Sequence, residues 1–538
     1  MKRAAAIAGT SVLMVGLGLG LGLYVGQMQA PTTAAEPQPA AAASPPNVLV
    51  IVWDTVRADR MSVYGYERPT TPRIAEWAKG ARVYDEARSG GIWTLPAHAS
   101  LFTGLPPEST GADERWLWLD GQHLTMSEWF GDHGYDTFSF AANNLLSGET
   151  NLVQGFDTQW NTSRGRVKPM AKAMTKRKLI TRDVSNELTP GWSEPDHGAT
   201  NAEWRADYKD AAPLIGRGLV KWLDERPSEA PFFAFLNMME AHTPRIPSLE
   251  ARQQVMDDEE LIELGLRTDA GHINLHFYNF GKHDYSDRQL QAINGVYDAT
   301  LVDLDNATAD LFAALEAKGI LDNTIVVLTA DHGENLGDHH LFNHRFALYE
   351  TLLHVPLIIR YPQGLEPGHF EHPVSTVDLF ATLTDLAGIE TPALPSQSLL
   401  THQRAPISYM SVPLEREIRT VMQIYPEIEI EQWLKMGHSV VDDGYKLIRY
   451  SNDRHELYDL ATDPGELDNL FGSDPSREAA LMAKIDAWTD AAPPYDAAKR
   501  TENAKTVRAN QRDLLNQMKA LGYVVDDESE GGEEAPGH

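Results

Sequence analysis

Four largely apolar runs of strand length constrain the fold of this chain more than any other feature. They cover residues 47–53, 231–239, 324–330 and 355–361. A strand-length run without regular polar alternation predicts a strand buried on both faces, inside a mostly parallel sheet. Helical periodicity lies between the runs, for instance from Tyr297 to Lys318 and from Ser375 to Gly388. Strands alternating with helices predict an α/β fold with a mostly parallel central sheet flanked by helices.

Polar side chains follow three of these runs. Asp54 and Asp331 come directly after the first and third runs, and His242 follows the second. In open α/β sheets, ligands bind beyond the carboxyl ends of the strands. We therefore expect these side chains, from three separate strands, to lie at one rim of the sheet.

The sequence changes character at about residue 396, which predicts a main domain over 47–395 and a small α+β subdomain over 396–490. In the subdomain, residues 443–450 and 455–460 predict a hairpin of amphipathic strands. The segment 463–470 then turns into a helix. Residues 491–538 form a helical and acidic tail, and their acidic end is predicted to be disordered.

The N-terminus predicts export. Lys2 and Arg3 precede an uncharged apolar stretch over residues 4–26, as in an export signal. The stretch is also just long enough to span a bilayer as a helix. Residues 1–30 are therefore a signal peptide or, slightly favoured, a membrane anchor, and 31–46 a Pro/Ala-rich linker. The positive-inside rule places the rest outside the cytoplasm, in the periplasm or extracellular space.

The charge balance restricts the partners. The chain has 77 acidic and 46 basic residues, a net charge of −31. Such a surface repels the phosphate backbone, which excludes nucleic acid as a bulk partner. Residues 164–182 are an exception because they carry only basic charges. This segment is either a solvated loop or a flap that attracts an anionic substrate.

The segment from Trp93 to Gly104 holds the most specific motif. It resembles, without a gap, the sulfatase signature Cys-x-Pro-Ser-Arg followed five residues on by Thr-Gly, with Thr94 in place of the Cys. Most sulfatases oxidise that Cys to formylglycine, but this chain contains no Cys, so we expect no formylglycine. The alcohol of Thr94 suits phosphoryl transfer through a covalent intermediate instead. His98, where sulfatases have Arg, is expected to orient the nucleophile.

Two further segments resemble the metal motifs of the alkaline phosphatase/sulfatase superfamily. Residues 54–59 resemble the first motif, with Thr55 where many sulfatases have a second Asp. Residues 329–339 match the second motif, with His332 in place of the Asn of many sulfatases, as in phosphonate monoester hydrolases and phosphodiesterases. The resemblance implies four ligands for one divalent cation: Asp54, Thr94, Asp331 and His332.

This ligand set indicates the metal and its use. Two carboxylates, an imidazole and a hydroxyl suit Zn²⁺ or Mn²⁺ and would tolerate Ca²⁺. Because a Thr hydroxyl is a poor nucleophile near neutral pH, a bound cation is expected to favour its alkoxide.

The resemblance places three more residues. Residues 239–244 are similar to the segment that supplies a His contacting the substrate or leaving group, here His242. His344 occupies the place of a conserved family Lys, so both histidines are candidate general acids or anion contacts. Nucleotide pyrophosphatase/phosphodiesterases, which use a Thr nucleophile, are also similar around Thr94. They carry an anion-binding Asn where this chain has Arg115, the candidate substrate-binding residue.

These observations favour an exported, metal-dependent hydrolase of an anionic ester substrate. The leading hypothesis is cleavage of phosphate mono- or diesters, or related phosphonate or sulfate esters, through a covalent Thr94 intermediate. One alternative is a sulfatase that works without formylglycine. Two others are a transferase of phosphoryl-linked head groups between envelope glycans and a binding module that has lost catalysis. The oligomeric state stays open.

Overall fold

The computed structural model describes residues 44–162, 211–268, 272–413, 415–491 and 494–500, with Val507 and Leu514. The predicted signal or anchor, the basic segment 164–182 and the acidic end of the tail lie outside the described residues. Within the described ranges, no helix is both long and apolar enough to cross a membrane.

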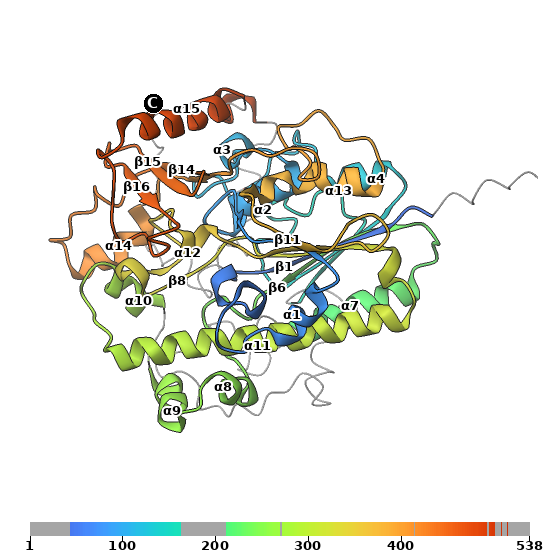
Figure 1. Ribbon diagram of the computed structural model, residues 1–538, viewed down its shortest axis with the longest axis horizontal. Coiled ribbons are helices and arrows are strands. Elements are labelled where there is room, and N and C mark those ends of the chain that lie inside the picture. Colours follow the sequence, from blue (N-terminus) through green and yellow to red (C-terminus); the bar gives the residue numbers. More distant parts are fainter. Residues whose placement is uncertain are drawn as a thin grey trace, which may run out of the picture. The chain divides into compact units, whose positions relative to one another are not determined.

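The central element is an eight-stranded sheet of order β11-β2-β10-β7-β1-β6-β4-β5 (Figure 1). The five strands from β7 to β5 are parallel to one another, whereas β10 is antiparallel to both of its neighbours. The predicted α/β fold is therefore confirmed. The bounds of the strands are β1 Asn47–Trp53, β2 Arg82–Tyr84, β4 Asp136–Ala141, β5 Thr158–Asn161, β6 Phe232–Met238, β7 Thr324–Thr329, β10 Leu357–Arg360 and β11 Gly368–Phe370.

The four predicted apolar runs are β1, β6, β7 and β10. Every residue of β6 and β7 is buried, as is every residue of β1 after Asn47. Burial on both faces explains why these strands lack polar alternation. At about 25 cal/mol per Å² of apolar surface removed from water, this part of the core dominates the stabilisation of the fold.

Helices cover both faces of the sheet (Figure 1). On one side lie α1 (Pro72–Ala78), α7 (Ala211–Glu225) and α11 (Asp287–Ala317), and α8 (Leu249–Val255) and α9 (Glu259–Arg267) pack on α11. On the other side lie α2 (Thr94–Thr103), α4 (Met126–Asp132) and α13 (Leu379–Ala387). Both layers bury apolar side chains against the strands, which is the layered arrangement expected of an α/β fold.

The long helix α11 has a well-defined start. The Ser286 hydroxyl accepts from the backbone N–H of Gln289, and the Gln289 side chain accepts from the backbone N–H of Ser286. This capping box satisfies two N–H groups that a helix otherwise leaves without partners. α11 therefore offers a firm support for the loops that pack against it.

A second, antiparallel sheet has the order β13-β14-β15-β16, and α15 packs against it. The predicted hairpin is β15–β16, which confirms that expectation. The prediction that the segment 463–470 turns into a helix is wrong: it contains one turn at residues 464–465 and is otherwise irregular, and the next helix begins at Pro475. The bounds are β13 Ile407–Met410, β14 Gly437–Asp442, β15 Tyr445–Tyr450, β16 Glu456–Asp459 and α15 Pro475–Ala491.

Shorter elements connect these layers. Two-stranded ladders join β3 to β12 and β8 to β9. The loop after β7 contains the second ladder, so it has a defined shape near the sheet rim. The bounds are β3 Ala87–Arg88, β8 Asn335–Leu336, β9 Phe342–Asn343, β12 Val374–Ser375, α3 Pro107–Thr110, α10 His272–Asn279, α12 Glu350–Leu353 and α14 Glu415–Ile424.

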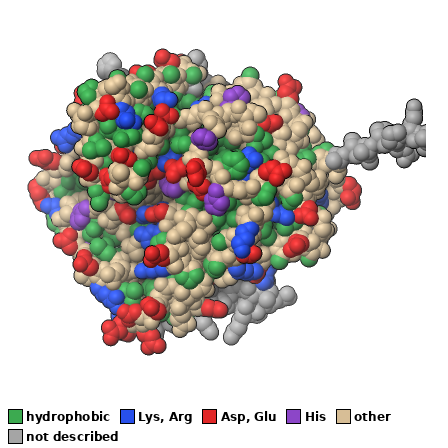
Figure 2. All heavy atoms as spheres, viewed as in Figure 1, with side chains coloured by type: hydrophobic (Ala, Val, Ile, Leu, Met, Phe, Trp, Pro, Cys, Tyr) green, Lys and Arg blue, Asp and Glu red, His purple; other side chains and the backbone are tan. Residues whose placement is uncertain are grey.

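The face shown in Figure 2 carries interspersed acidic, basic and hydrophobic side chains. No broad area of a single charge sign is visible among the described residues on this face. The excess of acidic residues is therefore spread over this face rather than gathered into one patch.

The position of Leu236 in the middle of the sheet gives a stability prediction. Leu236→Ala removes a fully buried side chain from β6 and should lower the free energy of unfolding by about 2–5 kcal/mol. Urea unfolding followed by circular dichroism measures the change. Glu316→Ala, at an exposed position of α11, is the control and should change it by less than about 0.5 kcal/mol. Equal midpoints for the two variants would contradict the burial of β6.

Candidate active site

The carboxyl ends of four neighbouring parallel strands meet at one rim of the sheet. Asp54 follows β1, Asp331 and His332 follow β7, His242 follows β6, and Asn143 follows β4. One ligand atom from each of Asp54, Asp331 and His332 lies within 4.8 Å of the other two, and all three residues are buried. The expectation that polar groups from separate strands converge here is confirmed.

Asp331 is held through one of its two carboxylate oxygens. Its Oδ1 accepts from the backbone N–H groups of Thr55, at 3.2 Å, and of His332, at 3.0 Å. The His332 Nδ1 lies 2.9 Å from the carbonyl oxygen of Gly333, which favours a proton on Nδ1. The His332 Nε2 then faces the Asp331 Oδ2 at 3.3 Å.

Asp54 is held in a similar way by two amides. Its Oδ2 accepts from Asn143 Nδ2 at 2.8 Å and from Asn237 Nδ2 at 3.2 Å. Asn237 belongs to β6 and Asn143 follows β4, so two adjacent strands orient this carboxylate. In each carboxylate one oxygen accepts the hydrogen bonds that orient the side chain. The other oxygen, Asp54 Oδ1 or Asp331 Oδ2, faces the space between Asp54, Asp331 and His332.

Asp54 Oδ1, Asp331 Oδ2 and His332 Nε2 are buried in that space. Apart from the contacts of Asp331 Oδ2 with His332 Nε2 at 3.3 Å and with His98 Nδ1 at 3.5 Å, these atoms make no hydrogen bond. Leaving a buried polar atom unsatisfied costs about 1–3 kcal/mol, more for a charged group. Two anionic oxygens and an imidazole nitrogen that converge in this way form a donor set for a divalent cation such as Mn²⁺ or Zn²⁺, and Ca²⁺ would be tolerated. The residues present therefore fit the predicted metal.

Burial and neighbouring charges together set the pKa values of Asp54, Asp331 and His332, the trio of candidate ligands. Burial, and then the Asp331 carboxylate, raise the pKa of Asp54 to about 7. Burial alone would lower the pKa of His332, but the two carboxylates outweigh it and raise that pKa to about 9. Burial opposes ionisation of Asp331 as well, yet His332 keeps its pKa below the usual range.

Thr94 is the first residue of α2 and is fully buried. Its Oγ1 lies 3.4 Å from the same Asn143 Nδ2 that donates to Asp54. The N-cap position of α2 is Trp93, which makes no side-chain cap bond, and Thr94 is the first residue inside the helix. The hydroxyl is therefore placed beside the trio, at the positive end of a helix, where an anion is favoured.

His98 lies one turn further along α2. Its Nδ1 is 2.9 Å from the carbonyl oxygen of Thr94 and 3.5 Å from Asp331 Oδ2. Burial lowers the pKa of His98, so the neutral ring is favoured. The residue thus links the first turn of α2 to a candidate metal ligand.

His344 lies next to His332, and His242 lies next to His344. The His344 ring centroid is 4.5 Å from that of His332 and 5.3 Å from that of His242. The His344 Nδ1 lies 3.3 Å from Glu334 Oε1, and Glu334 Oε2 accepts from Arg245 Nη2 at 2.8 Å. Burial, and then the positive charge of His332, lower the pKa of His344 well below its usual value.

Two of these neighbours were not predicted as site residues. From the sequence alone, Glu334 is expected to be part of the loop structure, yet it is fully buried and contacts the candidate catalytic His344. Asn143 was missed because the strand before it has polar residues at alternate positions. The rule that polar groups follow strand ends would have found it.

The sequence places Arg115 in the substrate site, but its side chain is exposed. Among the hydrogen bonds and ion pairs of the described residues, none joins its guanidinium to Thr94 or the trio. Its neighbour Glu114 is buried and accepts from Arg345 Nη1 at 3.1 Å. The Arg345 guanidinium lies 4.7 Å from the ring of Trp93, next to Thr94. Arg345 therefore contacts the residue next to Thr94, and the role of Arg115 stays a prediction.

Comparison with known proteins places the chain in a family. The model of the family named Sulfatase matches residues 46–389. The chain belongs to the sulfatase family. The model named N-sulphoglucosamine sulphohydrolase, C-terminal, matches residues 337–487, which include the β14–β16 hairpins.

Curated relatives cover most of this sulfatase-family chain. It is 36% identical to an N-acetylglucosamine-6-O-sulfatase of Bacteroides thetaiotaomicron, over 79% of this chain and 83% of that protein. It is 24% identical to arylsulfatase K of Homo sapiens, over 82% of each chain.

Solved structures agree on the fold. A phosphonate monoester hydrolase of Agrobacterium radiobacter has a TM-score of 0.62 at 20% identity, over 83% of this chain and 95% of that one. A protein solved in complex with its substrate D-glucosamine-2-N,6-O-disulfate has a TM-score of 0.62 at 20% identity, over 83% of this chain and 98% of that one. Taken with the family match, these neighbours make the chain an ester hydrolase of the sulfatase/alkaline phosphatase superfamily.

The pKa shifts give a prediction for metal binding. To act as ligands, His332, with a pKa raised to about 9, and Asp54, with a pKa raised to about 7, must both be deprotonated. The affinity for Mn²⁺ should therefore fall by about tenfold per pH unit from about pH 8.5 to 7, and more steeply below about pH 7.

Calorimetric titration of the purified chain with Mn²⁺ at several pH values tests this. In buffers of different ionisation enthalpy, it should also show about one proton released per ion at about pH 8. An affinity that does not change between about pH 6 and 8.5 would contradict the ligand set.

Proposed function

We propose that this sulfatase-family enzyme is a metal-dependent hydrolase of phosphate or phosphonate esters that works through a covalent Thr94 intermediate. The observation that supports the proposal best is the position of Thr94. Its hydroxyl lies at the N-terminus of α2 and shares Asn143 with Asp54, one of the three converging ligands.

The chemistry of the nucleophile favours phosphorus over sulfur. A formylglycine hydrate has a second hydroxyl that can expel the transferred group, whereas Thr94 has a single hydroxyl. A Thr ester must instead be cleaved by water, as in the covalent route of hydroxyl nucleophiles. The chain has no Cys from which formylglycine could be made. A phosphoryl group on an alcohol therefore suits this site.

The metal would be held by Asp54, Asp331 and His332, with Thr94 as the fourth ligand. When bound, it would lower the pKa of the Thr94 hydroxyl and offset negative charge on the non-bridging oxygens of the ester. The positive N-terminal end of α2, where Thr94 lies, would add to the electrostatic effect of the cation on the Thr94 hydroxyl.

In the first step, Thr94 Oγ1 releases its proton to solvent, attacks the phosphorus atom and forms a new P–O bond. The bond between phosphorus and the leaving-group oxygen breaks, and that oxygen receives a proton from His242, because burial holds the pKa of His344 well below its usual value. Glu334 and Arg245 hold the His344 ring from behind, since Glu334 contacts the His344 Nδ1 and pairs with Arg245.

In the second step, water attacks the phosphorus atom of the Thr94 ester. The histidine that gave up its proton takes one from the water, and the P–O bond to Thr94 breaks. Thr94 Oγ1 takes a proton back from solvent and regains its hydroxyl, and the product leaves as phosphate, a phosphate monoester or a phosphonate. The protons and bonds balance over the two steps, and the site returns to its starting state.

A sulfate ester is the second candidate substrate. The 36% identity to an N-acetylglucosamine-6-O-sulfatase favours it, and that relative would make a sulfated amino sugar the substrate class. Both candidates share an anionic ester, the same nucleophile and the same metal. They differ in the central atom, so a direct comparison of substrates separates them.

We also propose that the enzyme is exported. The two basic residues Lys2 and Arg3 and the apolar stretch 4–26 support export, through a cleaved signal or as an anchor. Expression of the full chain, followed by cell fractionation and N-terminal sequencing, distinguishes the two. Recovery of the uncut chain in the cytoplasm would contradict export.

Replacing Thr94 gives the main test of the mechanism. Thr94→Ala should lower kcat by about a thousandfold or more because no nucleophile remains. Thr94→Ser should retain measurable turnover. Both variants should still bind metal, which elemental analysis of the purified proteins checks. Turnover of Thr94→Ala at the wild-type rate would rule out the covalent route.

A substrate panel separates the two candidates. With matched aryl leaving groups, kcat/KM for a phosphodiester or phosphonate monoester should exceed that for the sulfate ester by at least about tenfold, or about 1.4 kcal/mol. The opposite order would establish the sulfatase alternative. Product analysis in the same assay tests hydrolysis against head-group transfer, since a hydrolase uses water as the only acceptor.

A further inference from the structure

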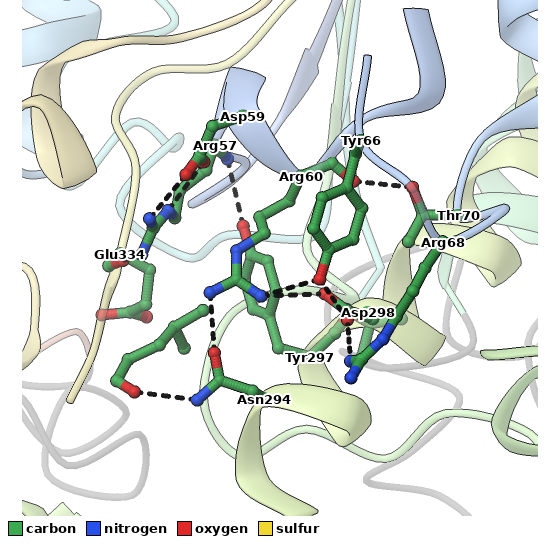
Figure 3. Close-up of polar contacts among 12 residues, drawn as sticks. Arg57, Asp59, Arg60, Tyr66, Arg68, Thr70, Asn294, Tyr297, Asp298 and Glu334 are labelled. Atoms are coloured by element: carbon green, nitrogen blue, oxygen red, sulfur yellow. Dashed lines mark hydrogen bonds and ion pairs between the residues drawn. The ribbon is translucent and has the colours of Figure 1, made fainter. Parts of the chain in front are cut away.

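Arg57 is a buried cation three residues after Asp54 that plays no part in the steps above. Its guanidinium holds Asp59 in a fork, with Nε 2.9 Å from Oδ1 and Nη2 2.7 Å from Oδ2 (Figure 3). Such a two-bond contact fixes direction as well as distance. This contact stays within one loop, because Arg57 and Asp59 both lie in the loop after β1.

The remaining nitrogen of Arg57 reaches a different loop. Nη1 donates to Asp338 Oδ2 at 2.8 Å and to the carbonyl oxygen of Glu334 at 3.2 Å. Residues 334–338 come directly after Asp331 and His332. One guanidinium therefore joins the loop that carries Asp54 to the loop that carries the other two candidate ligands.

A third contact fastens the first loop to α11. The backbone N–H of Arg57 donates to the Tyr297 hydroxyl at 3.0 Å, and that hydroxyl donates to the carbonyl oxygen of Thr55 at 2.9 Å (Figure 3). Tyr297 is fully buried in the middle of α11. The residues on either side of Val56 are thus held by a long, capped helix.

Stability alone does not explain this cluster. Arg57 must give up its contact with water, while the Asp59 side chain stays 53% exposed, so the ion pair adds little to stability. What a planar guanidinium offers, and an apolar side chain does not, is a fixed set of donors in one plane. That property matters here because the two loops carry carboxylates, Asp54 and Asp331, which repel each other.

We propose that Arg57 is a positioning residue for the metal site. It holds the loops of Asp54 and of Asp331 and His332 at the separation that a cation needs. The inference rests on the proposed metal dependence, and the experiment below tests the two claims separately.

The neighbouring residue Arg68 supplies a matched control. Its Nη1 pairs with Asp298 of α11 at 2.6 Å, in a group of polar contacts beside that of Arg57 (Figure 3). Its hydrogen bonds among the described residues do not reach the loop after β7. Arg68→Ala therefore removes an arginine and an ion pair from this group of contacts and leaves the connection between the two loops in place.

The test is calorimetric titration of Mn²⁺ into the purified full chain, with melting temperatures measured in a chelator. Arg57→Lys should weaken Mn²⁺ binding by about 10–100-fold, as expected when an outer contact of a metal site is lost, because an ammonium cannot make the fork and the bridge together. Asp338→Asn, which removes the charge from the bridge and leaves the Asp59 fork and the contact with the Glu334 carbonyl in place, should weaken Mn²⁺ binding in the same direction. The Mn²⁺ affinity of Arg68→Ala should stay within about twofold of the wild-type value, a much smaller change than that expected for Arg57→Lys.

Each outcome decides a different claim. If wild type binds no Mn²⁺, the metal proposal itself fails. If wild type binds and both Arg57→Lys and Asp338→Asn bind equally well, the positioning role of Arg57 is overturned. It is also overturned if Arg68→Ala weakens binding as much as they do, since the effect would then be general. Should Arg57→Lys fail to fold, Asp338→Asn alone decides.

Discussion

The structure of the site depends on bringing two carboxylates together where water is excluded. Asp54 and Asp331 follow adjacent parallel strands, so the register of β1 and β7 places them close to each other. In a medium of low polarity such a pair resists double ionisation, and burial, followed by the charge of Asp331, raises the pKa of Asp54. The surrounding groups compensate for this repulsion.

Several groups offset the repulsion between Asp54 and Asp331. Asn143 and Asn237 donate to Asp54, and backbone N–H groups donate to Asp331. His332 adds positive charge beside both carboxylates. The remaining unsatisfied oxygens and the His332 Nε2 are those that a divalent cation would satisfy. The buried Thr94 hydroxyl lies beside this space, where a bound cation would stabilise an alkoxide.

Much of this arrangement could be predicted from sequence because it follows from simple rules. Buried strands gave continuous apolar runs, and Asp54 and Asp331 followed them directly, so both the sheet and the rim were predictable. Glu334 and Asn143 could not be recognised in the same way. Their importance comes from contacts made by loops far apart in the sequence, such as Glu334 with Arg245 or Asn143 with Thr94. The exposure of the Arg115 side chain likewise depends on the geometry of its loop, which hydrophobic periodicity does not encode.

The most direct test of the central claim is a crystal structure of the Mn²⁺-loaded protein with anomalous diffraction data. We predict one strong peak at the rim, with Asp54 Oδ1, Asp331 Oδ2 and His332 Nε2 at about 2.0–2.4 Å from it and Thr94 Oγ1 completing the coordination. A peak bound by other side chains, or one that leaves Thr94 Oγ1 outside the coordination sphere, would contradict the assignment of the nucleophile and the chemistry drawn from it.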